Sequence, residues 1–191
     1  MSGVLLDRTA RPVIRGERTP FLDRIAPIGD VFGTAKYTVP TVTSALIAAQ
    51  ISRNADWEDA TRHITLSYIV GDVTEAAVKG AVGRQRPHYS GDPWRMRPLS
   101  LADEWHSFPS GHVTHITAIA AALAEEVHRP WATVLSAGAV VLTGWQRIYR
   151  DQHWASDVIG GAIVGTAASR ITAHWLRHRL HVTAGASPPP T

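Results

Sequence analysis

The sequence predicts an all-α protein, a helical bundle of about five core helices. Three observations support this fold class. Long apolar runs carry the spacing of helices, no stretch shows the strict apolar–polar alternation of a half-buried strand, and no glycine-rich nucleotide loop is present. Apolar residues make up 45% of the 191 residues and charged residues only 18%, so the chain can build one domain with a real core.

The chain divides into three parts when it is followed in order. Residues 1–35 are rich in Arg, Pro and Gly and weakly patterned, which predicts an N-terminal arm with one short helix around 21–25. Residues 36–182 form the helical domain, with helices expected at 40–52, 58–82, 110–127, 130–149 and 155–178. Gly83 breaks the second of these helices. Residues 183–191 include three consecutive prolines and are predicted to be a disordered tail.

Residues 88–107 are the longest irregular segment of the predicted domain. They contain Pro93, Pro98 and two tryptophans. A loop of roughly 20 residues inside a compact domain is usually functional. Because it leads directly into Ser110, where a helix is expected to begin, the loop is predicted to line or cover a site.

Composition excludes several classes of protein. The chain has no cysteine, which rules out disulfides, thiol catalysis and cysteine-ligated metal sites. Its formal net charge of +3 suits anionic substrates, a membrane surface or nucleic acid without choosing among them. No surface interleaves aromatic and basic residues, so no nucleic-acid partner is expected. The first 18 residues lack the pattern of a signal peptide.

Hydropathy alone favours buried helices of a soluble bundle over membrane spans. A spanning helix needs about 20 mostly apolar residues. The best candidates, at 39–51, 131–145 and 158–168, are shorter than that and contain Thr, Ser and Gly.

Three separate stretches carry residues suited to chemistry. In the first, Lys79 and Arg86 are seven residues apart, so they would project from one face if the helix continued that far, and Pro87 ends it. Taken alone, this stretch is better explained as a positively charged helix C-terminus, which the helix dipole favours.

The second stretch is Ser110-Gly111-His112, at a predicted helix start. Ser110 is a favoured N-cap residue. A hydroxyl, free backbone N–H groups and the positive end of the helix dipole suit an anion, and His112 places a proton carrier beside it. Taken alone, a helix cap followed by a solvated histidine explains it better.

The third stretch contains Arg147, His153 and Asp157. Because His153 and Asp157 are four residues apart, the carboxylate can reach one imidazole nitrogen across a helical turn. That contact would leave the other nitrogen free as a nucleophile or base. The alternative is a helix N-terminus that Ser156 or Asp157 merely caps.

Together the three stretches resemble the signature of the type-2 phosphatidic acid phosphatase and vanadium haloperoxidase superfamily. That signature reads Lys-x6-Arg-Pro, then Pro-Ser-Gly-His, then Ser-Arg-x5-His-x3-Asp. Lys79 to Pro87, Pro109 to His112 and Arg147 to Asp157 follow it in order and spacing. The one departure is Gln146, where the family usually has Ser. The resemblance covers about residues 60 to 170.

The resemblance implies a role for each matching residue. His153 would attack phosphorus and become a phosphohistidine, Asp157 would hold its ring, and His112 would protonate the leaving oxygen. The phosphoryl oxygens would be bound by Lys79, Arg86, Ser110, Gly111 and Arg147. Such a clamp needs no metal and no cofactor. His174 and His178 are four residues apart but are interpreted as part of a solvated helix face.

The expected function is therefore a metal-independent phosphatase acting on a phosphomonoester or diphosphate, favouring a lipid or isoprenyl phosphate. The alternatives are a vanadate-dependent haloperoxidase, whose members are generally much longer, and a soluble non-specific acid phosphatase. A catalytically silent helical protein would be expected to lack some of His112, His153 and Asp157, and all three are present.

The expected partner is a phosphorylated lipid or small-molecule substrate, and the sequence does not indicate an oligomeric state. Family resemblance favours membrane association. The weak hydropathy, with Asp72, Glu75 and Lys79 on the helix entering the site, instead favours a soluble cytoplasmic or periplasmic protein. Of the two, association with the cell membrane is the expected location, and the soluble form is the alternative.

Overall fold

The structure of the chain, a computed structural model, describes the backbone of residues 2–185 and the side chains of residues 6–178. The prediction of an all-α fold is confirmed. The helices are α1 (Ser2–Gly16), α2 (Pro20–Gly33), α3 (Ala35–Ser52), α4 (Ala55–Val82), α5 (Gly111–Val127), α6 (Pro130–Tyr149) and α7 (Ala155–Gly185), with a 3-10 turn, η1 (Asp103–Trp105). Within residues 2–185 the only strand-like pairing is an isolated bridge between Arg84 and Met96.

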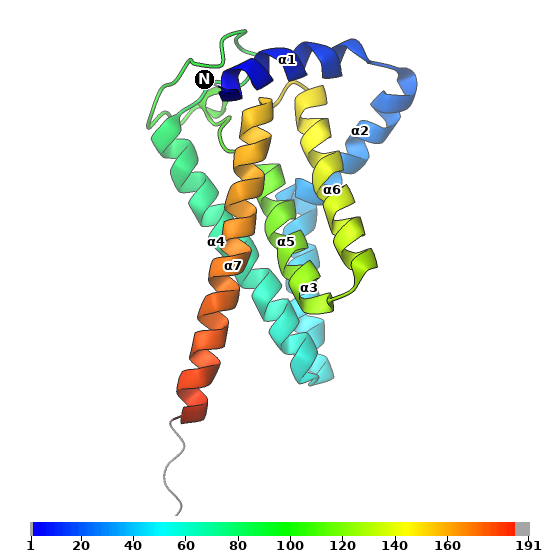
Figure 1. The fold of residues 1–191 in the computed structure, drawn as a ribbon, viewed down its shortest axis with the longest axis vertical. Coiled ribbons are helices and arrows are strands. Elements are labelled where there is room, and N and C mark those ends of the chain that lie inside the picture. The colour runs from blue at the N-terminus through cyan, green and yellow to red at the C-terminus, as the bar shows by residue number, and fades with distance from the viewer. Residues whose placement is uncertain (1, 186–191) are drawn as a thin grey trace, which may run out of the picture.

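Helix α5 lies at the centre of the bundle, where it packs against α4, α6 and α7 (Figure 1). Two glycines of α7 allow it to approach α5 closely. A Cβ atom on Gly161 would lie 2.6 Å from the carbonyl oxygen of Ser110, and one on Gly165 would lie 2.6 Å from that of Thr114. Small residues at these positions therefore bring the start of α7 against the start of α5. The apolar side chains that α5 buries are Val113, Ile116, Ala118, Ala120 and Ala122.

The N-terminal arm is more ordered than the sequence predicted. In place of one short helix around 21–25 it forms α1 and α2, and α1 lies across the end of the bundle (Figure 1). Thr19 caps α2 by accepting a hydrogen bond from Leu22 N at 3.2 Å. Helix α1 is fixed by charged side chains, because Asp7 and Arg11 form ion pairs with the rest of the chain. Apolar periodicity alone gave little sign of that docking.

The five predicted core helices correspond to α3–α7, with shifted ends. Helix α3 begins at Ala35 rather than at 40, so Pro40 lies inside it. Helix α4 begins three residues earlier than predicted because Asn54 caps it, accepting a hydrogen bond from Trp57 N at 3.1 Å. Helix α7 runs on to Gly185, so residues 183–185 of the predicted tail are helical. Residues 186–191 of that tail lie outside the described residues.

The sequence contains three short apolar stretches, at 39–51, 131–145 and 158–168, as candidate membrane spans. Among the helices of the described chain, none combines the length and the apolar character needed to cross a membrane.

Candidate active site

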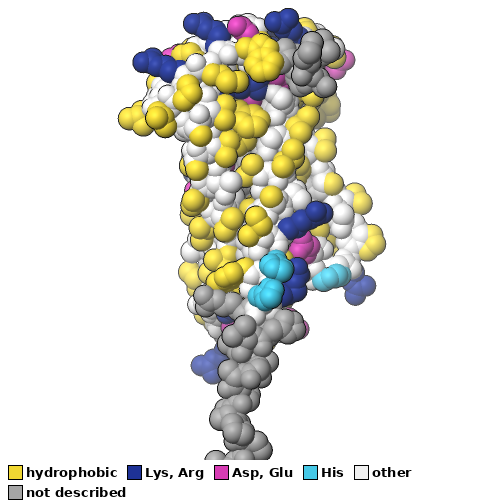
Figure 2. All heavy atoms as spheres, turned by 60° about the vertical axis from the view of Figure 1, so that its left-hand side comes forward, with side chains coloured by type: hydrophobic (Ala, Val, Ile, Leu, Met, Phe, Trp, Pro, Cys, Tyr) yellow, Lys and Arg dark blue, Asp and Glu magenta, His cyan; other side chains and the backbone are white. Residues whose placement is uncertain are grey.

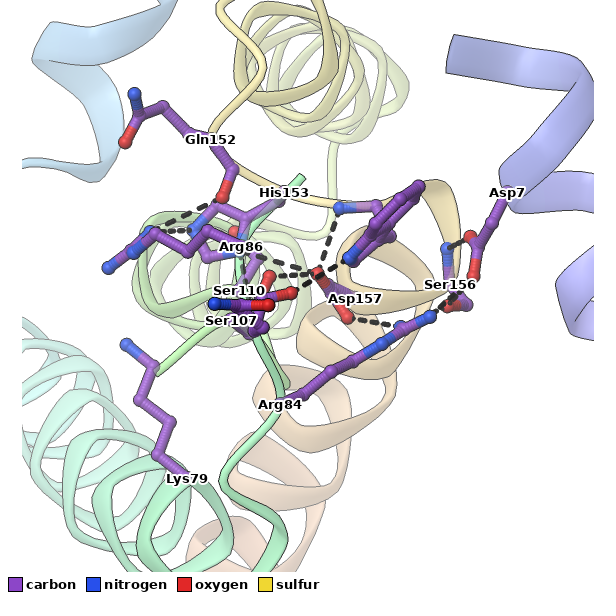
Figure 3. Close-up of polar contacts among 12 residues, drawn as sticks. Asp7, Lys79, Arg84, Arg86, Ser107, Ser110, Gln152, His153, Ser156 and Asp157 are labelled. Carbon is purple, nitrogen blue, oxygen red and sulfur yellow. Dashed lines mark hydrogen bonds and ion pairs between the residues drawn. The ribbon is translucent and has the colours of Figure 1, made fainter. Parts of the chain in front are cut away.

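The segment after α4 brings Arg84 and Arg86 to the end of the bundle where Lys79 of α4 also lies (Figure 3). Helix α4 ends at Val82 because Gly83 adopts a left-handed conformation with φ of 59°. A side chain there would also collide with the backbone of Arg97. The helix therefore stops before Arg86, and the two-turn spacing predicted for Lys79 and Arg86 is not what brings them together. The turn at Gly83 redirects the chain instead.

His153 is almost completely enclosed, with 2% of its side chain exposed. Its Nδ1 atom lies 2.7 Å from the backbone carbonyl of Ser107, which can only accept a hydrogen bond. Its Nε2 atom lies 3.3 Å from Nη1 of Arg86, which can only donate one. The neutral tautomer with its proton on Nδ1 satisfies both contacts. Nε2 therefore presents a lone pair toward Arg86.

Burial lowers the pKa of His153 to about 4, and the nearby carboxylate of Asp157 opposes that shift. At neutral pH the imidazole is therefore uncharged, as a nitrogen nucleophile must be.

Asp157 lies four residues after His153, as predicted, but the two do not form a close hydrogen bond. The Asp157 Oδ2 atom is 3.7 Å from His153 Nδ1. Oδ2 instead accepts from the Ser107 hydroxyl at 2.5 Å and from Trp154 N at 2.8 Å. Burial favours the neutral acid, but contacts with His153, Arg84 and Ser107 outweigh it and lower the pKa of Asp157. The carboxylate thus contributes negative charge and holds the segments on both sides of the imidazole.

Arg84, which was not among the predicted site residues, is the main cationic partner of that carboxylate. Its Nη1 donates to Asp157 Oδ1 at 2.6 Å, and its side chain is 7% exposed. Figure 3 shows Arg84 and Asp157 in this contact, with Arg86 and Lys79 on the other side of Ser107 and Ser110. A lone Arg between two motif residues carries no distinctive sequence signal, so only the fold reveals its position.

The start of α5 lies beside these groups. Ser110 is fully buried and caps the helix through its backbone, but its hydroxyl forms no capping hydrogen bond and has no partner among the described residues. Gly111 faces the α4 side chains. A Cβ there would lie 2.5 Å from Glu75 Oε1 and 3.2 Å from Lys79 Nζ. Lys79 itself is paired with Glu75 one turn earlier in α4. The Ser110 hydroxyl, the N-terminus of α5 and the Lys79 ammonium group therefore lie close to one another, a combination that suits an anion.

His112 and Arg147 lie together on the side of the site formed by α2. Arg147 Nη2 donates to Asp30 Oδ1 at 2.7 Å, and the same oxygen is 3.4 Å from His112 Nε2. Thr34 Oγ1 is 3.1 Å from that nitrogen. Burial, followed by the positive charge of Arg147, lowers the pKa of His112 to about 2. In the absence of an added anion, His112 is therefore uncharged.

The departure from the family pattern at Gln146 has a structural consequence. Its Oε1 accepts a hydrogen bond from Arg147 Nε at 2.7 Å. Asp30 and Gln146 thus hold the guanidinium of Arg147 from two directions. Neither residue was predicted to belong to the site. Gln146 was noted only as a departure from the signature, and Asp30 carries no signal in the sequence.

One group of side chains in the described chain has the composition of a metal site. The ligand atoms of Asp72, Glu75 and His115 lie within 4.8 Å of one another. These atoms already have protein partners, because His115 Nε2 pairs with Asp72 at 2.8 Å and Glu75 pairs with Lys79.

The comparisons with known proteins agree on a family. The PAP2 superfamily matches residues 60–180 of this chain. Among curated proteins, the lipid A 1-phosphatase of Porphyromonas gingivalis is 33% identical over 114 residues, or 56% of this chain and 23% of that protein. The lipid A 1-phosphatase of Rhizobium johnstonii is 35% identical over 98 residues, or 50% and 39%. The undecaprenyl-diphosphatase of Sulfolobus acidocaldarius is 26% identical over 103 residues, or 54% and 48%.

These matches span less than half the length of the curated relatives. Two solved structures share the fold over most of both chains. Aquifex aeolicus LpxE has a TM-score of 0.69 and 22% identity, covering 86% of this chain and 93% of that one. A transmembrane PAP2 type phosphatidylglycerolphosphate phosphatase from Bacillus subtilis has a TM-score of 0.65 and 19% identity, covering 90% and 85%.

Proposed function

Because this chain belongs to the PAP2 superfamily, we propose that it is a metal-independent phosphatase that works through a phosphohistidine. The observation that carries the proposal is the state of His153. Its buried imidazole is uncharged, its Nδ1 proton is directed to Ser107, and its Nε2 lone pair faces the guanidinium of Arg86. A nucleophile already facing a cation suits attack on a bound phosphate.

The proposed reaction has two steps. His153 Nε2 forms a bond to phosphorus while the bond from phosphorus to the leaving oxygen breaks, and His112 gives that oxygen its proton. Water then attacks phosphorus, the phosphorus–nitrogen bond breaks, and His112 accepts the proton from the water. The released products are the alcohol, or a shorter phosphate, and inorganic phosphate. The phosphoryl oxygens would be bound by Lys79, Arg86, Ser110, Gly111 N–H and Arg147.

His112 requires a proton for the first step, although it is uncharged in the free site. Burial and the surrounding cations lower its pKa to about 2. A bound phosphate carries negative charge into the same space, which favours the imidazolium. Substrate binding therefore supplies the charge that lets His112 act as the acid. This coupling limits proton donation to the occupied site.

A lipid phosphate or isoprenyl diphosphate is the proposed substrate. The loop between α4 and α5 borders the site, since Asp103 pairs with Arg86 at 2.7 Å and Ser107 contacts His153. Its outer side exposes Trp94, Met96, Leu99 and Leu101. Exposed apolar residues beside a phosphate site suit a substrate with hydrocarbon chains. The names of the curated relatives, lipid A 1-phosphatase and undecaprenyl-diphosphatase, are consistent with this chemistry.

Association with a membrane is the corresponding proposal for location. On the face drawn in Figure 2, hydrophobic side chains extend over the middle of the molecule and charged side chains gather toward its ends. Exposed apolar residues of α4 and α7 include Ile69, Val73, Ile159 and Ile163. Scattered apolar residues are ordinary on a protein surface, but several on neighbouring helices favour contact with lipid.

A phosphate-release assay tests activity, substrate and location together. The enzyme is given phosphatidic acid, lipid A, undecaprenyl diphosphate and an aryl phosphate, in detergent and in vesicles. Release from one of the lipids at a rate well above that from the aryl phosphate is expected, with the enzyme recovered in the membrane fraction. Turnover of the aryl phosphate alone, by enzyme in the soluble fraction, would reject the lipid substrate and the membrane location. Absence of release from all four would reject the phosphatase proposal for these substrate classes.

A further inference from the structure

Asp7 is a buried carboxylate on α1, outside the region that matches the family, yet it lies next to the proposed catalytic residues. We propose that Asp7 is a positioning residue of the active site, an inference that rests on the proposed function. It holds Arg84 and the first turn of α7, and through them it fixes Asp157 beside His153. Helix α1 would then be part of the catalytic unit.

The hydrogen bonds of the Asp7 side chain link α1 to Arg84 and to the first turn of α7. Its Oδ2 accepts from Arg84 Nη2 at 2.7 Å and from the Ser156 hydroxyl at 2.8 Å, while Oδ1 accepts from Ser156 N at 2.8 Å. The Asp7 side chain is completely inaccessible to solvent. Figure 3 shows Asp7 reaching from α1 to Ser156 and to the end of the Arg84 side chain. A carboxylate bound in this way also satisfies a free N–H group at the start of α7.

Arg84 links the two carboxylates. One of its terminal nitrogens donates to Asp7, and the other donates to Asp157 at 2.6 Å and to Ser156 at 2.6 Å. Its Nε donates to the carbonyl of Pro93 at 2.9 Å, so the guanidinium is held on all sides. Two buried negative charges thus share one buried positive charge. Removing the charge of Asp7 would leave Arg84 to act on Asp157 alone.

Helix α1 also has a docking contact that bypasses the catalytic residues, which allows a matched control. Arg11, one helical turn after Asp7, donates to Asp151 at 2.7 Å and to the carbonyl of Pro87 at 2.7 Å. A role for Asp7 in docking alone would make Asp7→Asn and Arg11→Gln equivalent. A positioning role would separate them.

The activity test compares these two variants of the full chain at a temperature where both are folded. Asp7→Asn is expected to lower kcat by about tenfold with little change in KM, because the nucleophile and its carboxylate are misplaced but the phosphate clamp remains. Arg11→Gln is expected to lower the melting temperature while keeping kcat within about twofold of wild type. Equal kcat in wild type and Asp7→Asn, or equal losses in both variants, would overturn the proposal.

A charge-conserving variant covers the case in which Asp7→Asn does not fold. Asp7→Glu keeps a negative charge beside Arg84, so neither Arg84 nor Asp157 loses a charged partner, but the longer side chain moves the carboxylate relative to Arg84 and Ser156. It is expected to fold and to have a lower kcat than Arg11→Gln. Wild-type kcat in folded Asp7→Glu would overturn the proposal.

The titration of His153, followed by NMR on the folded protein, gives a readout that does not need turnover. The charged and titratable groups around its ring are Asp157 on α7, Lys79 on α4, Arg84 and Arg86 after α4, His112 on α5 and Arg147 on α6. Asp7 adds a negative charge behind Arg84. Removing that charge disfavours the imidazolium, so Asp7→Asn should shift the pKa of His153 downward by roughly half a unit.

The direction in which the pKa of His153 shifts distinguishes a positioning role of Asp7 from a general loosening of the site in Asp7→Asn. Because burial is the main cause of the low pKa of His153, a loosened site would admit water and raise that pKa toward 6.5. A rise, or no change relative to Arg11→Gln, would overturn the proposal. If wild type hydrolyses no substrate, the proposed function fails and this titration still decides the role of Asp7.

Discussion

His153 donates its Nδ1 proton to the backbone carbonyl of Ser107 across 2.7 Å. The main chain of the loop before α5, rather than the carboxylate of Asp157, therefore sets the tautomer of the proposed nucleophile. Asp157 contributes at longer range, 3.7 Å from the same nitrogen. This division of roles allows the contributions of the carboxylate and the loop to be tested separately.

Replacing the proposed nucleophile should abolish turnover without unfolding the protein. In His153→Ala no other imidazole is proposed to attack phosphorus, so phosphate release should fall to background. The far-UV circular dichroism spectrum should stay helical, because His153 precedes α7 rather than lying within it. Wild-type phosphate release by His153→Ala would contradict the mechanism.

The two partners of the imidazole should differ in their effects. Ser107→Ala keeps the carbonyl that binds His153 but loses the hydroxyl bonded to Asp157, so we expect a loss of about 2 kcal/mol in the free energy of unfolding and less than tenfold in kcat. Asp157→Ala removes a buried charge from Arg84 and from the imidazole, so kcat should fall on the order of a thousandfold. Urea unfolding and steady-state kinetics measure both quantities. A larger kcat loss in Ser107→Ala would assign the main role to the hydroxyl.

Orthovanadate should inhibit the enzyme with an affinity that depends on the protonation of His112. Burial and neighbouring cations lower the pKa of His112 to about 2 in the free site, and a bound anion raises it. Between these two values binding takes up a proton, so affinity should weaken as pH rises and then level off above the pKa of the bound state. The slope of inhibition constant against pH should disappear in His112→Asn. An unchanged slope in that variant would assign the proton to another group.

Activity should be indifferent to metal chelation. No step of the proposed mechanism uses a metal, and the carboxylates of Asp72 and Glu75 are paired with His115 and Lys79. Dialysis against EDTA should therefore leave kcat unchanged. A functional metal site at these residues would give a different result. EDTA would then abolish activity, and zinc or magnesium would restore it in wild type but not in Asp72→Asn.

The free energy of unfolding should fall in mild acid because of His153. Its pKa is about 4 in the folded protein, below the ordinary value of 6.5. Its contribution is fully present above pH 6.5 and is lost as pH falls toward 4, because the unfolded chain then binds the extra proton. His153 should contribute about 3 kcal/mol to this loss, and His112, whose pKa is also lowered, adds to the same decline. Urea unfolding between pH 7 and 4.5 measures it.

Two variants separate this contribution from a general acid effect. The pH dependence should be weaker in His153→Gln and unchanged in a variant of the exposed His128, His128→Asn. An identical decline in wild type and His153→Gln would place the titrating group elsewhere.

The fold class could be predicted from the sequence, and so could the eight residues proposed to form the phosphate site. Helical periodicity is a local property, so α3–α7 were predictable, although capping residues such as Asn54 moved their ends. Motif spacing singled out Lys79, Ser110 and His153 because a phosphate requires fixed residue types. It did not show what holds them, since spacing records no contact between distant segments.

The tertiary structure alone decided the surroundings of that site. Asp7, Arg84 and Asp30 are ordinary charged residues in the sequence, and they became recognisable only when folding buried them or paired them with catalytic candidates. The same applies to the carbonyl of Ser107, because every residue carries one. What a charged group or a carbonyl contributes to the site depends on its burial and on partners that are far away in the chain. Both are set by how α1, α2 and α7 pack around the start of α5.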